Sequence, residues 1–346
     1  MRARQSNKST RETTMTTYTR LALAPLALTL SMAAAQAVAD DGHTGPTFGG
    51  QIVGGVLDVD DRDKDLWAFR AEAGVGGIYH VNDALRIRYD LIGDFANAIN
   101  TVDEQTWTPG AHRQDDGEVY IRTARVLLLT DFGSFGFQPR VPSGFWHQIY
   151  NNVDTFEYNR FHAQTGQNAI FGQAEQGSDV LSYGSPRFGG GFQLIGAVLT
   201  TNAQNGQDFD IYSGRLVYDQ GPLNFGIGHT QVRRPGIDNL HRTSIGIGYD
   251  FGMVQLGGVY EHNDDREDSS GASDFDAWGV NVSANLSDDW SVSVGYAEND
   301  KNLGLENDAV VGTVRYHFNE DVYAFVEAAR YDNTDNNLAG GISVSF

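Results

Sequence analysis

Alternation of large apolar residues with small or polar ones is the feature that most limits how this chain can fold. In residues 290–296 Trp, Val, Val and Tyr alternate with Ser, Ser and Gly, and residues 223–228 and 278–286 repeat the pattern. A period of two predicts β-strands with one apolar and one polar face. By this rule we expect about sixteen strands, over residues 47–57, 66–79, 84–96, 117–130, 134–141, 178–186, 190–201, 208–219, 222–232, 241–250, 253–262, 274–286, 289–298, 308–318, 321–331 and 337–346.

The connections between these strands alternate in length. Short turns such as residues 131–133 and 250–252 alternate with polar loops such as residues 97–116 and 262–273. Short turns at one end and long loops at the other are typical of a transmembrane antiparallel β-barrel, and a barrel of about sixteen strands encloses a lumen that side chains cannot fill. A soluble β-sandwich is the alternative, but it gives no reason for this asymmetry. The sequence therefore predicts an all-β membrane barrel with a water-filled lumen.

The N-terminal residues have the pattern of a secretory signal peptide. Arg20 precedes an apolar run over residues 21–30, and Ala37 and Ala39 occupy the positions that specify cleavage. We therefore expect residues 1–39 to be a signal peptide and residues 40–346 to form a single barrel domain in the cell outer membrane. The first fourteen residues fit no part of the pattern, so Met15 is an alternative start.

Composition argues against several classes of function. The formal net charge is −21, and residues 1–39 hold five basic residues and one acidic residue, so export would make the chain more acidic by four charges. An acidic balance of this size argues against a nucleic-acid partner. The chain has no cysteine and no G-x-S-x-G or H-E-x-x-H motif, which are the signatures of common redox, hydrolase and metalloprotease sites. We therefore expect no catalytic residues, no metal site and no cofactor.

Several short segments give the chain a family resemblance. They are residues 120–126 with 131–136, residues 182–190, residues 218–222 and the terminal Phe346. The chain resembles the trimeric general porins of Gram-negative bacteria, and the likeness runs over nearly the whole of residues 48–346. This resemblance implies a homotrimer that allows passive diffusion of small hydrophilic solutes, lies in contact with lipopolysaccharide and is inserted by the barrel-assembly machinery. It also implies that Phe346 is the assembly signal and that the third long loop narrows the pore.

The segment over residues 141–177 occupies the place of that loop. It is rich in aromatic residues, so packing inside the barrel is a better expectation than disorder. Asp154 and Glu157 lie three residues apart and would point the same way in a helical turn. We expect them to form the acidic side of a pore constriction, with Glu175 and Asp179 as lesser candidates. The alternative is that these carboxylates are solvated loop charges with no specific role.

Strand parity predicts the opposing basic side. By alternation Arg70 lies on the strand face opposite Trp67 and Phe69. A charge on the lipid face would cost about 2–4 kcal/mol at the membrane midplane, so we expect Arg70 to face the lumen. Arg122 and Arg125 are an odd number of residues apart, so a regular strand cannot turn both inward; we favour Arg122, with a bulge or a subunit contact accounting for the other. The predicted basic side consists of Arg70, Arg86, Arg88, Arg122 and Arg140.

The acidic excess of the chain predicts a preference for cations. Two other functions are alternatives to a general porin. One is a substrate-specific channel in which the aromatic residues of the long segment guide a sugar. The other, which the missing catalytic motifs disfavour, is an outer-membrane barrel enzyme.

Overall fold

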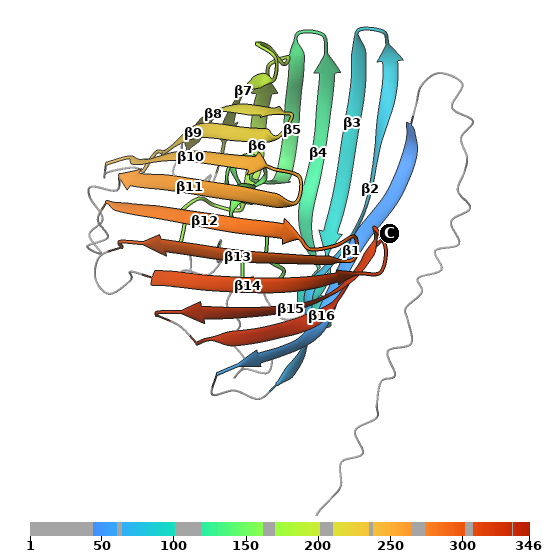
Figure 1. The fold of residues 1–346 in the computed structure, drawn as a ribbon. Coiled ribbons are helices and arrows are strands. Elements are labelled where there is room, and N and C mark those ends of the chain that lie inside the picture. The colour runs from blue at the N-terminus through green and yellow to red at the C-terminus, as the bar shows by residue number, and fades with distance from the viewer. Residues whose placement is uncertain are drawn as a thin grey trace, which may run out of the picture. The chain divides into compact units, whose positions relative to one another are not determined.

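The computed structural model describes residues 44–60, 64–100, 119–161, 170–200, 210–234, 238–264, 274–301, 307–333 and 335–346. These residues form a closed barrel in which every strand is antiparallel to its neighbours and β1 pairs with both β2 and β16 (Figure 1). This confirms the predicted all-β barrel of sixteen strands. The predicted signal peptide lies outside the described residues.

The strands are β1 (Thr44–Val59), β2 (Asp65–Asn82), β3 (Leu85–Asp94), β4 (Tyr120–Thr130), β5 (Gly133–Pro142), β6 (Gln176–Gly184), β7 (Phe192–Leu199), β8 (Ile211–Gln220), β9 (Leu223–Val232), β10 (Leu240–Asp250), β11 (Val254–Asp264), β12 (Phe275–Asn285), β13 (Trp290–Asn299), β14 (Asn307–His317), β15 (Val322–Tyr331) and β16 (Asn337–Ser345).

The alternation in the sequence divides each strand between two environments. In β10 the side chains of Ile245, Ile247 and Tyr249 are exposed on the outer face, whereas Ser244 is fully buried on the inner face. The same division recurs in β12 and β13, where valines point outward and Asn281 and Ser293 are buried inside. An apolar outer face and a polar inner face are what a barrel in lipid requires.

Aromatic side chains gather where the strands meet the short turns. Tyr249 contacts Phe251 at a ring-centroid distance of 4.5 Å, and Tyr316 contacts both Trp290 and Phe318 at about 5 Å. Such rings suit the boundary between lipid and water because one edge is apolar and the other tolerates polar groups.

Two aromatics of β2 depart from strand parity. Regular alternation places Trp67 and Phe69 on the lipid face, opposite Arg70, but both pack with a buried cluster that includes Val53 and Phe325. The pairing of β1 with β2 shifts register between Val53 and Gly54, so one extra residue of β2 is accommodated there. A β-bulge of this kind reverses the faces that side chains on one side of it occupy relative to those on the other. The parity prediction is therefore wrong for Trp67 and Phe69, which point inward together with Arg70.

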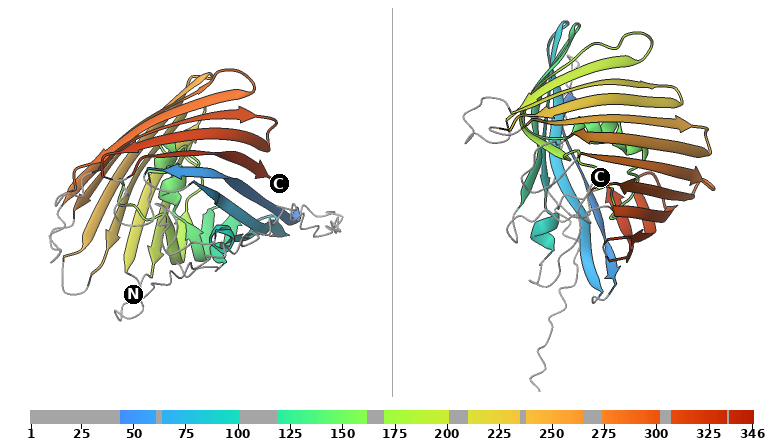
Figure 2. Two further views of the ribbon diagram at one scale, coloured as in Figure 1. Left: turned by 90° about the horizontal axis from the view of Figure 1, so that it is seen from below. Right: turned by 90° about the vertical axis from the view of Figure 1, so that its left-hand side faces the viewer.

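The long segment between β5 and β6 runs along the inside of the barrel wall. It contains α2 (Gly144–Gln148) and η1 (Tyr150–Asn152), and the hydroxyl of Ser143 caps α2 by accepting a hydrogen bond from the Phe145 amide. A further short helix, α1 (Ala96–Ile99), follows β3. Figure 2 shows the strands closing around α2. Within the described residues no helix is both long and apolar enough to span a bilayer.

Small residues on the inner wall make room for this segment. A Cβ atom on Gly246 would lie 2.6 Å from the carbonyl oxygen of Ile149, and one on Gly226 would lie 2.7 Å from the Ile149 side chain. Both distances are too short for a real contact, so these positions need glycine. The aromatic side chains of the segment fill the remaining space and are almost fully buried, with alanines and valines of β11–β15 beneath them.

Candidate pore constriction

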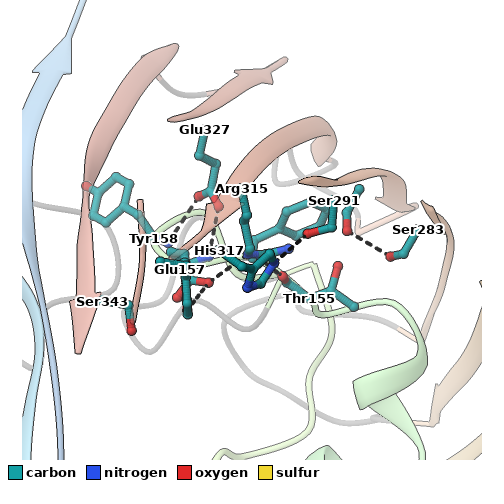
Figure 3. Close-up of polar contacts among 12 residues, drawn as sticks. Thr155, Glu157, Tyr158, Ser283, Ser291, Arg315, His317, Glu327 and Ser343 are labelled. Carbon is teal, nitrogen blue, oxygen red and sulfur yellow. Dashed lines mark hydrogen bonds and ion pairs between the residues drawn. The ribbon is translucent and has the colours of Figure 1, made fainter. Parts of the chain in front are cut away.

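Glu157 is bound to the barrel wall next to the segment that carries it. Its Oε1 atom lies 3.1 Å from Nε of Arg315 in β14 and accepts a hydrogen bond of 2.6 Å from the Tyr323 hydroxyl in β15. A terminal nitrogen of Arg315 also donates to the carbonyl oxygen of Thr155. Figure 3 shows this arrangement. The Glu157 side chain is only 8% exposed, so its charge is balanced by Arg315 and not by the arginines that the sequence pointed to.

Asp154 has a different local role. Its Oδ1 atom accepts a hydrogen bond of 3.0 Å from the backbone amide of Phe161, within the same segment. A carboxylate that closes a turn in this way satisfies a backbone donor that would otherwise be buried without a partner. The structure therefore places the two predicted acids in structural contacts, one with the wall and one with the segment's own backbone.

A buried carboxylate on β15 holds the segment in place. The two oxygens of Glu327 accept hydrogen bonds from the backbone amides of Glu157, Tyr158 and Asn159 at 2.8, 3.0 and 2.7 Å, and from the Asn159 side chain at 3.0 Å (Figure 3). Glu327 is fully buried. All four partners are donors, so the ionised carboxylate fits this site and neutralises the partial positive charge of three amides.

A second buried carboxylate fixes the two ends of the segment together. Glu261 on β11 accepts hydrogen bonds from the Tyr150 hydroxyl, from the backbone amide of Gly172 at 2.6 Å and from the Asn263 side chain at 2.6 Å. Arg242 on β10 lies 3.8 Å away. Sequence reasoning missed both Glu261 and Glu327 because an inward-facing acid in a strand looks like any other luminal charge.

The predicted arginines lie on β2–β5, as parity requires, and several are joined by shared carboxylates. Asp90 on β3 bridges the predicted Arg88, at 3.0 Å, and Arg125, which the prediction left out, at 2.7 Å. Arg88 is 44% exposed and Arg125 is 27% exposed, whereas Asp90 is only 13% exposed. The guanidinium groups therefore contact the lumen more than the acid that pairs with them.

Arg122 and Arg125 both point inward because β4 is irregular. The pairing of β3 with β4 shifts register between Ile92 and Gly93, which leaves Arg122 as the extra residue. Arg122 then lies 2.7 Å from Glu72 on β2 and 3.5 Å from Glu175 of the long segment. The sequence indicated a bulge or a subunit contact here, and the structure shows the bulge.

The other predicted arginines have varied surroundings. Arg70 donates to Gln51 at 2.6 Å, and Arg140 donates to Gln176 and Ser178 at 2.7 Å each. Arg86 is exposed and forms no ion pair with another described residue.

The two lesser acidic candidates differ from each other. Glu175 faces Arg122, whereas Asp179 has a positive φ of 50° and its exposed side chain lies in β6 among outward-facing residues. Glu175 is therefore the candidate acid that the structure brings closest to the predicted basic side.

More arginines face the lumen than the sequence prediction includes. Besides Arg125, they are Arg215 on β8, Arg242 on β10 and Arg315 on β14, each on the inner face of its strand. The signal that could have found them is the same parity, since Arg242 shares a face with Ser244 and Gly246, opposite Ile245.

Several solved structures share this architecture. An anion-selective porin from Comamonas acidovorans superimposes with a TM-score of 0.70 at 16% sequence identity, covering 87% of this chain and 99% of that chain. OmpF of Salmonella typhi in complex with daunomycin gives 0.67 at 15% identity, over 87% and 97% of the two chains. The trimer form of OmpT from Vibrio cholerae gives 0.64 at 15% identity, over 88% and 100%. Identities this low show a shared fold alone.

The family of the chain is shown by its sequence. No curated protein sequence matches it, but the model of the Gram-negative porin family matches residues 22–336. That match spans almost the whole barrel and includes every strand that carries the inward arginines. Membership of this family, together with the closed barrel, implies a channel in the outer membrane. The chain belongs to the Gram-negative porin family.

Proposed function

We propose that this porin is a non-enzymatic, water-filled channel for the passive diffusion of small hydrophilic solutes and ions. The observation that supports this most is the row of inward arginines on β2–β5, with Arg88 nearly half exposed to the lumen. Arginines that face one side of a narrow pore set up a fixed transverse field, which orders water and favours polar solutes over apolar ones. The predicted constriction consists of this basic side and the acids of residues 141–177.

Single-channel recording in a planar bilayer tests this proposal. We expect stepwise conductance in KCl and liposome swelling that falls off with solute mass without chemical preference. Absence of conductance from correctly folded protein would contradict it. Steps that close in threes would support a homotrimer, which the trimer form of the similar Vibrio cholerae OmpT also suggests.

The acidic net charge of −21 supports a cation preference. A similar structure is described as an anion-selective porin, so the fold is compatible with the opposite sign. The reversal potential in a KCl gradient decides between them, and clear anion selectivity would refute the cation proposal.

The aromatic residues of the long segment cannot serve as a sugar slide. Trp146, Tyr150, Phe161 and Phe171 are each at most 6% exposed and lie in a cluster against the inner wall. A guiding surface must be in contact with the solute, so this form of the substrate-specific alternative has no support in the described residues.

Export and membrane assembly complete the proposal. We propose that residues 1–39 direct secretion, that Phe346 is read by the barrel-assembly machinery, and that lipopolysaccharide surrounds the outer face. Phe346 is 65% exposed and its backbone is paired with Gly50 of β1, so its ring is accessible. Replacing Phe346 with Ala should lower the amount of folded barrel in outer-membrane fractions without changing secretion.

A further inference from the structure

A cavity of about 410 Å³ lies between α2 and the inner face of β4–β10. Its lining contains the three arginines Arg125, Arg215 and Arg242, several glutamines, and no Asp or Glu. The lining is therefore basic and rich in hydrogen-bond donors. A cavity of this size is within the range of small-molecule sites.

Arg215 is the residue in this lining whose charge is not balanced. Its Nε donates to Gln148 at 2.5 Å and its guanidinium carbon lies 5.5 Å from the centre of the Phe145 ring. Unlike Arg125 and Arg242, it forms no ion pair with a described residue, and its two terminal nitrogens have no acceptor among those residues. A guanidinium removed from bulk water without a counter-charge is costly, and an anion would relieve that cost.

A buried hydroxyl beside Arg215 provides a second observation. Thr230 on β9 is 5% exposed, and its Oγ1 atom is buried without a hydrogen-bond partner among the described residues. In the sheet Thr230 pairs with Arg242 on one side, and Gly228, two residues before it on the same face, pairs with Arg215 on the other. The hydroxyl therefore lies between the two arginines. Buried hydroxyls normally have a partner, so this one indicates a ligand position.

The rest of the cavity wall is apolar. Ile195, Leu199 and Ile211 are part of it. A ligand that fits the whole cavity needs one anionic end for the arginines and a hydrocarbon body for this wall. Arginine binds a carboxylate through two parallel hydrogen bonds, which a halide ion cannot form.

We propose that this cavity retains small carboxylates with an apolar body, held by the terminal nitrogens of Arg215, the hydroxyl of Thr230 and the charge of Arg242. The inference rests on the proposed channel, because it makes the cavity a binding station for solutes in the lumen. It is a local site and is independent of the ion preference of the open pore. Benzoate is a suitable probe, and benzamide has the same shape without the charge.

Single-channel current in KCl with added benzoate tests the site. We expect benzoate to interrupt the current in a concentration-dependent way and benzamide not to do so. Arg215→Gln and Thr230→Val should each shorten the benzoate residence time about tenfold, because each loses a hydrogen bond to a charged group. Arg330→Gln removes an arginine from the exposed outer positions of β15 and should leave the residence time unchanged.

The outcomes separate this inference from the proposed function. A channel that conducts KCl but gives the same current with benzoate and benzamide overturns the carboxylate site and leaves the channel proposal intact. Interruption that survives both cavity substitutions overturns it as well. Calorimetric titration of the detergent-solubilised protein with benzoate measures the same binding without any conductance. Binding there that is lost in Arg215→Gln supports the site even if no pore opens, and absence of binding overturns it.

Discussion

The hydrogen bonds of Glu327 hold the long segment against the barrel wall, and the substitution Glu327→Gln tests their contribution. In Glu327→Gln one oxygen can still accept from Tyr158 and from both nitrogens of Asn159, as Oε1 does now. The side-chain NH2 group of the glutamine then takes the place of Oε2, which now accepts a hydrogen bond of 2.8 Å from the backbone N–H of Glu157. Two donors then face each other, and that hydrogen bond is lost. One lost bond with an unsatisfied buried donor costs about 1–3 kcal/mol, and each of the three remaining bonds weakens by about 1 kcal/mol when the charge is removed. Relief of the buried charge offsets part of this.

Together these contributions lower the free energy that opposes local opening of the segment by about 3 kcal/mol. Amide hydrogen exchange reports local opening, and each 1.36 kcal/mol corresponds to a factor of ten. We therefore expect the amides of residues 157–159 to exchange about a hundredfold faster in Glu327→Gln, with larger current noise from the open channel. Protonation of Glu327 in acid should have the same effect on the unchanged protein, because it also replaces an acceptor with a donor.

The matched control is Glu320→Gln, which removes a carboxylate from the exposed turn between β14 and β15. It should leave the exchange at residues 157–159 as it is. If Glu327→Gln also leaves that exchange unchanged, or if both variants accelerate it equally, the carboxylate does not hold the segment and the reasoning fails.

Substitutions at three other positions inside the barrel test the remaining contacts. Arg88→Gln should make the pore about two- to threefold more cation-selective, because one unit charge about 7 Å from a permeating ion in water is worth about 0.6 kcal/mol; an unchanged reversal potential would show that Arg88 does not contribute to the field. Glu157→Gln leaves Arg315 without its carboxylate and should shift the reversal potential the opposite way, towards anions, in the same recording. Gly246→Val pushes a side chain into the backbone of Ile149 and should cost about 1–3 kcal/mol of stability in heat-denaturation gels, whereas Gly214→Val, with open space around it, should not.

The barrel could be predicted because its pattern repeats in every strand. In each strand the alternation separates lipid-facing from lumen-facing residues independently of the other strands. A wrong prediction for one strand therefore does not affect the others. The bounds found for β9 (Leu223–Val232) and β15 (Val322–Tyr331) differ by one residue from those expected from alternation. Within the described residues, strand parity fails at the bulge beside Phe69, whereas the odd spacing of Arg122 and Arg125 already indicated a bulge or a subunit contact in β4. A bulge depends on how two strands pair, and the residues around Phe69 include no pair of charges whose spacing would reveal it.

The contacts of the long segment could not be predicted for a different reason. Glu327 binds backbone amides 168–170 residues earlier in the chain, and Glu261 binds Tyr150 across 111 residues. Pairings of this kind depend on where the segment lies inside the barrel, which no local pattern records. The sequence did supply the positions, since Arg215, Arg242 and Arg315 obey the same parity as Arg88. The prediction stopped at Arg140 in β5 because nothing in the sequence showed that arginines of later strands would face the same lumen.

The whole chain is acidic, but several acids inside the barrel are more buried than the arginine Arg88. Glu157, Glu261 and Glu327 are at most 8% exposed and are already bonded to the segment or the wall. Arg88, by contrast, is 44% exposed, and Asp90 is shared between it and Arg125. These three acids are therefore bound in contacts that position the segment, and Arg88 is the more exposed charge. Any cation preference must then arise from acids elsewhere, whose influence is screened within about 10 Å at 0.1 M salt but about 3 Å at 1 M. The preference should therefore weaken as salt rises, and one that persisted unchanged at 1 M would mean that buried acids still act on the permeating ion.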